Sequence, residues 1–84
     1  MAQDAQIRQK QTETEDIKQK VALLTKREHQ VMELVVEGKA NKVIARELGL
    51  SQKTIEFHRG HIMEKMQVES VAQLVRIYLA VKDL

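Results

Sequence analysis

The chain has 84 residues, three glycines, no proline, no cysteine and, apart from histidine, only two aromatic residues, Phe57 and Tyr78. This length allows one small domain, and the composition favours helices over an all-β fold. The absence of cysteine excludes a disulfide framework and a thiolate metal site. No apolar run is long enough for a signal peptide or a membrane-spanning helix, so we expect a cytoplasmic protein without a membrane partner.

The net charge of +2 is unevenly distributed along the chain. Residues 38–66 carry six basic side chains against three acidic ones, and no other segment has a positive excess. The basic residues of this segment are Lys39, Lys42, Arg46, Lys53, Arg59 and Lys65. The excess predicts that a polyanion binds here, although so small an excess also suits an ordinary solvated surface.

Residues 1–22 are polar and contain no helix-breaking residue. A sparse apolar stripe of roughly heptad spacing runs along and just beyond them: Ile7, Ile17, Val21 and Leu24. We predict a polar linker over residues 1–22 that is helical from about Glu13. A helical connector to another domain explains the pattern better than a coiled coil, and a plain linker is the simpler alternative.

The first strong helix signal covers Leu24–Gly38. Thr25 and Glu28 have the spacing of a capping box at its start, and Gly38 is typical of a helix end. The expected buried stripe is Val31, Met32, Leu34 and Val35.

A short helix over Lys42–Leu48 and a longer one over Gln52–Gln67 are predicted next, joined by a turn at Gly49. We expect Asn41 and Ser51 to cap these two helices and Gly49 to adopt a positive φ. The inward residues of the short helix are Ile44, Ala45 and Leu48. Such a helix-turn-helix typically lays its second helix in the major groove of DNA.

The longer helix has two distinct faces. At about 100° per residue, Ile55, Ile62 and Met66 fall on one side, which we expect to be buried. The outward face and its flanks carry Lys53, Glu56, Phe57, Gly60, His61 and Glu64. A phenylalanine on an outward face suggests contact with base edges, where thymine methyl groups accept apolar side chains.

A last helix is expected to start after Ser70, with Gln73 at the capping-box position. Its core stripe is predicted to be Val71, Leu74, Val75 and Tyr78. Additional apolar residues widen the arc well beyond the roughly 100° that one core needs, and we assign them to a homodimer surface: Ala72, Ile77, Leu79 and Val81. Scattered exposed apolar residues are the alternative explanation.

These residues resemble the LuxR-type helix-turn-helix domain, most closely its FixJ/NarL-like response regulators. The resemblance runs without gaps over about residues 23–82 and rests on Leu24, Thr25, Arg27, Glu28, Val31, Gly38, Asn41, Lys42, Ile44, Ala45, Leu48, Ser51, Thr54, Ile55, His58, Ile62, Lys65 and Met66. The later residues Arg59, Met63, Val68, Ser70, Val71 and Ala72 favour the FixJ-like branch.

The resemblance implies an all-α fold, with a four-helix DNA-binding domain over residues 23–84 after the linker helix. It implies that residues 52–67 read double-stranded DNA and that the last helix forms a homodimer, which we expect on inverted half-sites. It also implies an N-terminal receiver or sensory domain in the full-length protein, and RNA polymerase is a further expected partner. The chain would then be an excised effector domain or a naturally short family member.

The resemblance also indicates DNA-contacting positions: Lys42 and Thr54 for phosphates, and Glu56, Phe57 and Gly60 for bases. Charge and position on the helix add further residues to this set. The expected base-reading residues are then Lys53, Glu56, Phe57, Gly60 and His61. The expected phosphate contacts are Lys42, Arg46, Ser51 and Thr54. Family members with Lys at the positions of Glu56 and Gly60 differ from this chain, so their target sequences cannot be transferred. Glu56 would accept from a cytosine amino group, and Gly60 would permit close approach to the groove.

Other chemistry has little support in the sequence. His58 and His61 are three residues apart, but Glu64 is a poorly placed third ligand, so we expect no metal and no cofactor. There is no Gly-rich phosphate loop or nucleophile motif, so we expect no enzyme. For Arg59, an ion pair with Glu28 or Glu33 and a phosphate contact are equally compatible with its position.

One alternative function remains from the sequence. A helical interaction module resembling sigma-factor region 4 could dock on polymerase or on an anti-sigma partner. The salt dependence of binding to duplex DNA separates the two hypotheses, because a DNA-binding protein loses affinity steeply as salt rises.

Overall fold

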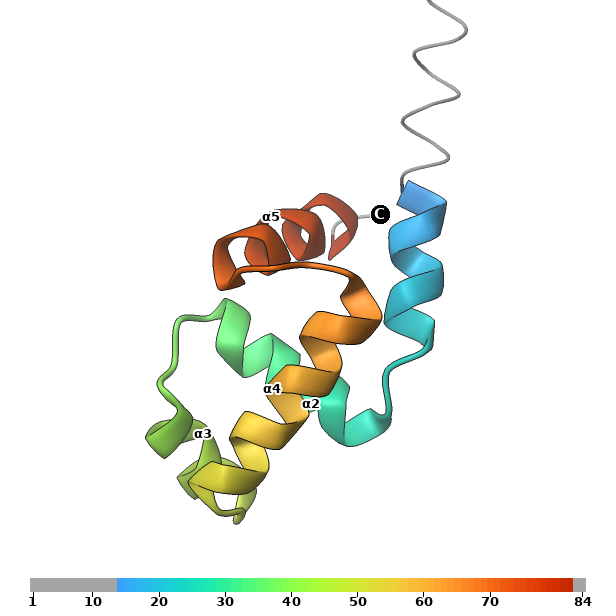
Figure 1. Ribbon diagram of the computed structural model, residues 1–84. Helices are drawn as coiled ribbons and strands as arrows, with labels where there is room; N and C mark the ends of the chain where they lie inside the picture. Colours follow the sequence, from blue (N-terminus) through green and yellow to red (C-terminus); the bar gives the residue numbers. More distant parts are fainter. Residues whose placement is uncertain (1–13, 83–84) are drawn as a thin grey trace, which may run out of the picture.

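The computed structural model describes residues 14–82, which form helices joined by short connections. A helix over residues 14–22 is followed by α2 (Lys26–Val36), α3 (Asn41–Leu48), α4 (Gln52–Met66) and α5 (Val71–Lys82) (Figure 1). The predicted all-α fold, with four helices after a linker helix, is confirmed for this part of the chain. The predicted start of the linker helix at about Glu13, and Ile7, lie outside the described residues.

The cap residues of α2 agree with the sequence pattern. The Thr25 hydroxyl accepts the backbone N–H of Glu28 at 3.1 Å, and the Glu28 carboxylate accepts the backbone N–H of Thr25 at 2.9 Å. The predicted capping box is therefore confirmed. The helix ends at Val36, just before Gly38, whose φ of +90° is one that few residues other than glycine adopt.

The turn of the helix-turn-helix was predicted correctly, but one of its caps was not. Gly49 has the expected positive φ, +69°, and the Ser51 hydroxyl accepts the Thr54 N–H at 3.1 Å. Asn41 is not the cap of α3. Ala40 occupies that position without a side-chain bond, and Asn41 is the first residue of the helix.

The ends of α4 and α5 also differ in detail from expectation. α4 stops at Met66, and Gln67 adopts a left-handed conformation with φ +56°. The Ser70 hydroxyl accepts the Gln73 N–H at 3.2 Å, as predicted. The Gln73 side chain instead accepts the N–H of Glu69 at 2.7 Å, so the reciprocal bond of a capping box falls one residue earlier.

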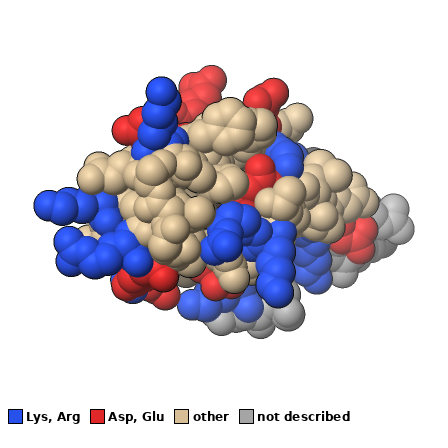
Figure 2. Space-filling model, turned by 90° about the horizontal axis from the view of Figure 1, so that it is seen from below, with Lys and Arg blue, Asp and Glu red and all other residues tan. Residues whose placement is uncertain are grey.

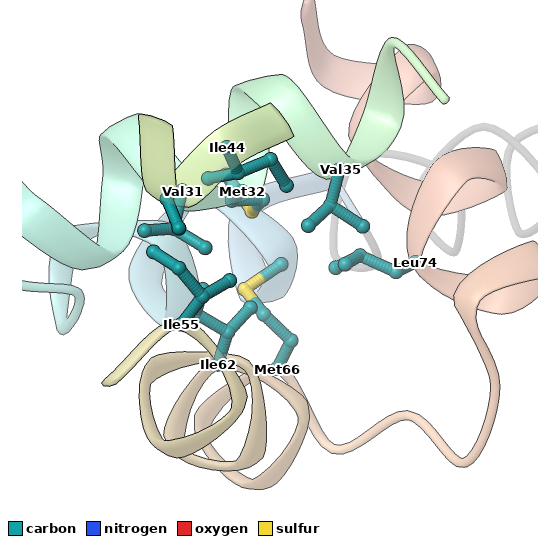
Figure 3. Close-up of a cluster of buried hydrophobic side chains, with 9 residues drawn as sticks. Val31, Met32, Val35, Ile44, Ile55, Ile62, Met66 and Leu74 are labelled. Atoms are coloured by element: carbon teal, nitrogen blue, oxygen red, sulfur yellow. The ribbon is translucent and has the colours of Figure 1, made fainter. Parts of the chain in front are cut away.

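One apolar cluster joins the four helices (Figure 3). Its buried residues are Val31, Met32, Val35, Ile44, Ala45, Ile55, Ile62, Met66 and Leu74. The predicted inward side of α4 is confirmed, since Ile55, Ile62 and Met66 are all at most 1% exposed. Leu34 and Leu48, expected inside, are only half-buried at the edge of the cluster. Burial of this side fixes the opposite side of α4 toward solvent.

α5 covers one edge of the cluster, so less of its apolar arc is buried than predicted. Leu74 is the buried residue of this helix, while Val71, Ile77 and Tyr78 are half-buried against the cluster. The helix over residues 14–22 lies beside the end of α5 (Figure 1) and contributes further contacts to the cluster through Ile17 and Val21. No helix within residues 14–82 is both long and apolar enough to span a lipid bilayer.

Candidate nucleic-acid interface

The outward face of α4 carries most of the residues predicted to read bases. Phe57 is 64% exposed, and Lys53, Glu56 and Gly60 are also exposed. The predicted orientation of Phe57 is therefore confirmed. Because the opposite side of α4 is locked into the core, these side chains project from a rigid helix into solvent and are free to contact another molecule.

Two aromatic rings contact each other on this face. The centroids of the Phe57 and His61 rings are 4.4 Å apart with the planes tilted by 47°. The two residues are one helical turn apart, the spacing at which side chains on one helix meet. His61 is less exposed than Phe57, with 45% of its side chain accessible. We call Phe57 and His61 the aromatic pair.

The basic side chains of α3, of the start of α4 and of the segment before α3 differ in whether an acidic side chain already pairs with them. Lys42, Arg46 and Lys53 are exposed, and among the described residues no ion pair involves them. Lys39 instead pairs with Glu47 at 2.9 Å and with Glu37 at 3.5 Å. The bond to Glu47 raises the pKa of Lys39. The unpaired cations are therefore the better candidates for phosphate contacts.

The start of α4 offers neutral donors beside those cations. Ser51 and Thr54 share a hydrogen bond between their hydroxyls at 2.8 Å, and the free backbone N–H groups of a helix start favour anions. Seen from below, the molecule shows lysine and arginine side chains around a largely uncharged area, with acidic side chains among them (Figure 2). The side of the molecule seen in Figure 2 is thus mixed in charge rather than uniformly basic.

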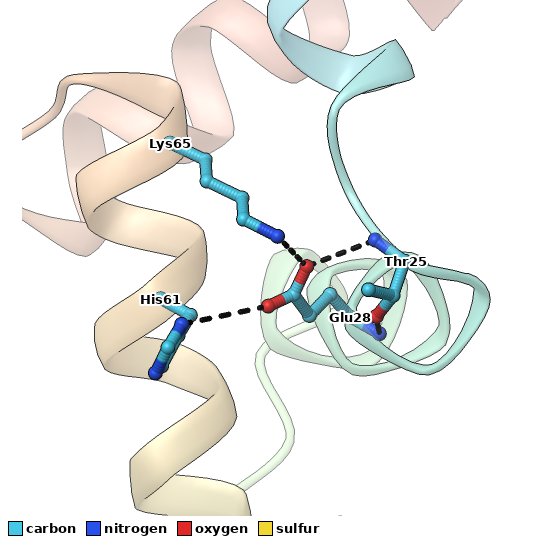
Figure 4. Close-up of polar contacts among 4 residues, drawn as sticks. All are labelled: Thr25, Glu28, His61 and Lys65. Atoms are coloured by element: carbon cyan, nitrogen blue, oxygen red, sulfur yellow. Dashed lines mark hydrogen bonds and ion pairs between the residues drawn. The ribbon is translucent and has the colours of Figure 1, made fainter.

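A buried carboxylate holds the recognition-helix candidate against α2 (Figure 4). Glu28 is only 4% exposed. One of its oxygens, Oε1, accepts from Lys65 Nζ at 2.6 Å and from the Thr25 N–H at 2.9 Å. The other, Oε2, lies 4.0 Å from His61 Nδ1. Burial raises the pKa of Glu28, but the bonds from Lys65 and Thr25 outweigh burial and leave the pKa lowered.

Of the two roles considered for Arg59, the ion pair with Glu28 or Glu33 is not found among the described residues. Arg59 instead donates to the Asn41 side chain at 2.5 Å and so joins α4 to the start of α3. Sequence reasoning found Glu28 only as a cap residue and missed its role in linking two helices. The sequence signal that could have indicated this link is Lys65, which comes four residues after His61 and therefore lies on the same edge of α4.

Comparison with known proteins decides the family. The family described as bacterial regulatory proteins, luxR family, matches residues 22–78. The chain belongs to this family. It is 49% identical over 63 residues to the transcriptional regulatory protein FixJ of Bradyrhizobium diazoefficiens, which covers 75% of this chain and 31% of FixJ. It is 43% identical over 68 residues to the response regulator protein TodT of Pseudomonas putida, covering 81% of this chain and 30% of TodT.

Solved structures agree with this assignment of the LuxR-family domain. Full-length FixJ from B. japonicum superposes with a TM-score of 0.82 at 41% identity, covering 93% of this chain and 38% of that one. The structure of the response regulator StyR superposes with a TM-score of 0.78, also at 41% identity. The chain spans about a third of the length of these curated relatives, between 30% and 33% for those named FixJ, TodT and nodulation protein W. It is a LuxR-type helix-turn-helix DNA-binding domain of the kind that response regulators carry as their output domain.

In this LuxR-family domain, the residues assigned to the homodimer fall into two groups. Ala72 is exposed and Leu79 is 52% exposed. Ile77 packs against the core, and Val81 lines a small groove that also includes Val21. Ile77 is thus not a free surface residue, because its side of α5 faces the apolar cluster.

The histidines of the LuxR-family domain are not part of a metal-binding group. Within residues 14–82, no three or more His, Cys, Asp or Glu side chains are grouped so that they could hold a metal ion. His58 and His61 each contact the Phe57 ring, with centroids 6.4 Å and 4.4 Å from it. Their geometry is that of surface ring contacts.

Proposed function

We propose that this chain binds duplex DNA sequence-specifically by laying α4 in the major groove. The observation that carries this proposal is the exposed Phe57, paired with the half-buried His61, on the outer face of a helix whose inner face is the core of the domain. A major groove about 12 Å wide admits one α-helix, and its base edges differ for each base pair. A rigid helix with one exposed face suits that groove.

The proposal gives each predicted residue a role. Base edges meet the outer face of α4, namely Lys53, Glu56, Phe57, Gly60 and His61. Phosphates meet the start of α4 and the exposed cations of α3, namely Lys42, Arg46, Ser51 and Thr54. Phe57 offers an apolar surface to thymine methyl groups, and Glu56 accepts from cytosine amino groups. The acidic Glu56 lowers nonspecific affinity for DNA and in return favours particular bases.

We further propose that two copies bind inverted half-sites through α5. The exposed apolar side of this helix, with Ala72, Leu79 and the neighbouring Val75, is the surface that a second copy would cover. Inverted half-sites match the two-fold symmetry of such a dimer. The relatives are about three times longer and are named as response regulators or regulatory proteins. A receiver or sensory domain on the N-terminal side of the linker, in the full-length protein, is therefore part of the proposal.

Selection of bound sequences from random duplexes tests this function, combined with titrations of the recovered site at several salt concentrations. We expect one enriched motif with inverted half-sites and an affinity that falls steeply with salt, because phosphate contacts release counterions. Recovery of no motif, together with a flat salt dependence, would contradict the proposal. That outcome would favour a protein-docking module that resembles sigma-factor region 4.

A further inference from the structure

Three side chains form a row along one edge of α4, each four residues from the next. Phe57 is exposed at one end, His61 is half-buried in the middle, and Lys65 lies at the other end. The row ends at Glu28, which comes from α2 and is buried. A continuous chain of contacts therefore leads from a buried carboxylate to the face that we propose meets DNA.

The two oxygens of Glu28 have different surroundings. Oε1 accepts two hydrogen bonds, from Lys65 Nζ and from the backbone N–H of Thr25. Oε2 faces His61 Nδ1 at 4.0 Å, the only pairing of this oxygen among the described residues (Figure 4). The separation is too long for a hydrogen bond, but the negative charge at Oε2 attracts a proton on the facing nitrogen and so favours the form of the ring that carries its proton there.

The second nitrogen of His61 then takes the opposite character. A neutral imidazole that carries its proton on Nδ1 has an unprotonated Nε2, which is a hydrogen-bond acceptor. Nε2 lies on the far side of the ring from Nδ1, away from Glu28 (Figure 4). Since 45% of the His61 side chain is accessible, the ring is open to a ligand. The Phe57 ring, whose centroid is 4.4 Å from that of His61, limits the positions that the His61 ring can adopt.

We propose that Glu28 is a positioning residue that sets base preference. It holds His61 with the proton on Nδ1, so that Nε2 accepts a hydrogen bond from a base amino group in the major groove. The proposal rests on the DNA-binding function proposed above. The amino groups available there are N6 of adenine and N4 of cytosine, whereas guanine O6 and thymine O4 are acceptors and would repel Nε2.

The contact with Phe57 narrows the preferred base pair further. Phe57 packs on the same edge of α4 and offers an apolar surface to a thymine methyl group. An adenine–thymine pair presents both the adenine amino group and the thymine methyl group in the major groove. The aromatic pair therefore prefers adenine–thymine at one position of the half-site.

The first part of the test needs no DNA. Two-bond nitrogen–proton NMR of the 84-residue chain, above the pH at which histidine is protonated, reports which nitrogen of His61 carries the proton. We expect Nδ1 in the unchanged chain and a shift toward Nε2 in Glu28→Gln. Glutamine is also accepted at the capping-box position, so this variant keeps the cap of α2. Thermal unfolding followed by circular dichroism checks that it remains folded.

A matched control is available on the same helix. Glu33→Gln changes an exposed α2 carboxylate that faces His29 Nδ1 at 3.2 Å, and no ion pair among the described residues joins it to α4. It should leave the His61 tautomer and the base preference unchanged. His61→Phe keeps an aromatic ring beside Phe57 but removes both nitrogens, so it should lose the same base preference as Glu28→Gln.

The second part measures DNA binding with single-base substitutions across the selected half-site. We expect Glu28→Gln and His61→Phe to lose about tenfold discrimination at one adenine–thymine position. Affinity for nonspecific DNA should remain within about twofold, since no contact to phosphate changes. A variant that only loosened the fold would weaken binding to every sequence and would leave discrimination intact.

Each result decides one of the two proposals. A proton on Nε2 of His61 in the unchanged chain, or discrimination that survives in both variants, would overturn the role of Glu28. The expected tautomer in a chain that binds no duplex would instead overturn the proposed function, and the base preference with it.

Discussion

Arg59 of α4 donates a hydrogen bond to the side-chain oxygen of Asn41 at the start of α3, at 2.5 Å. This bond spans the helix-turn-helix from one helix to the other. It uses an asparagine that the sequence pattern assigned to a helix cap and an arginine for which the pattern left an ion pair and a phosphate contact equally open. The bond joins α3 to α4, and we expect it to help fix the angle between the two helices.

Asn41→Ala should lower the free energy of unfolding by about 1–2 kcal/mol, because it removes the acceptor of a partly buried guanidinium. Asn41→Asp should keep the stability, since a carboxylate accepts from arginine at least as well. Chemical denaturation measures both. Arg27→Ala, which removes an exposed bond to Gln30, is the control and should cost less than about 0.5 kcal/mol. An Asn41→Ala variant as stable as the unchanged chain would show that the bond to Arg59 adds nothing to stability.

Glu28 should make the domain sensitive to acid. Burial opposes ionisation, but the bonds from Lys65 and Thr25 lower the pKa of Glu28 below its usual value of 4.5 in the folded state. The unfolded state then binds more protons, so stability is complete above about pH 4.5 and is lost as the pH falls through the folded pKa. Unfolding free energies between neutral and acidic pH should fall less steeply in Glu28→Gln. Equal slopes for both proteins would contradict a lowered pKa.

The features that the sequence predicted well are local ones. The Thr25 capping box and the positive φ of Gly49 depend on residues within one turn. The inward side of α4 follows from helical periodicity alone. The bonds that were missed join distant residues: Glu28 and Lys65 are 37 positions apart, and Asn41 and Arg59 are 18 apart. Such pairs depend on how the helices dock, which periodicity does not specify.

The same reason explains the partial error at α5. Its apolar arc was recognised, but which edge faces the core depends on the docking of the helix. Ile77 was assigned to the outside and packs against the core, whereas Val75 was assigned to the core and is only half-buried. At the proposed DNA face, the outward position of Phe57 could be predicted, because it is the geometric opposite of a clear buried stripe.

Gly60→Ala should stabilise the free domain and weaken its specific complex. A Cβ at this exposed helical position meets nothing within 4 Å, so alanine should add about 0.5–1 kcal/mol to the free energy of unfolding. If α4 approaches the bases closely at Gly60, the added methyl group should reduce affinity for the selected site several-fold. Gly49→Ala is the opposing control. Because Gly49 has a φ of +69°, alanine there should lower the free energy of unfolding by about 1 kcal/mol. A stabilised Gly60→Ala variant with full affinity would remove Gly60 from the contact surface.

Lys42→Ala should weaken specific and nonspecific DNA binding alike. The loss of one phosphate contact should reduce the slope of log affinity against log salt by about one unit. Lys39→Ala is a matched control three residues earlier in the chain. We expect Lys39 to be less available to phosphates, because it is already paired with Glu47 and Glu37. Its slope should remain close to that of the unchanged chain. Titrations at several salt concentrations compare the two, and equal slopes for both variants would place Lys42 outside the interface.

Leu79→Glu should leave the domain folded and abolish cooperative binding to a duplex with two inverted half-sites. Leu79 is 52% exposed, so a charge there costs little in the single domain. In a dimer through α5, the charge would be buried in an apolar contact, and an unpaired buried charge is strongly unfavourable. Ala80→Glu adds the same charge at the next residue, which points elsewhere around the helix at about 100° per residue. It should therefore retain cooperativity. Band shifts with one and with two half-sites measure the difference, and cooperative binding by Leu79→Glu would show that two copies meet through another surface.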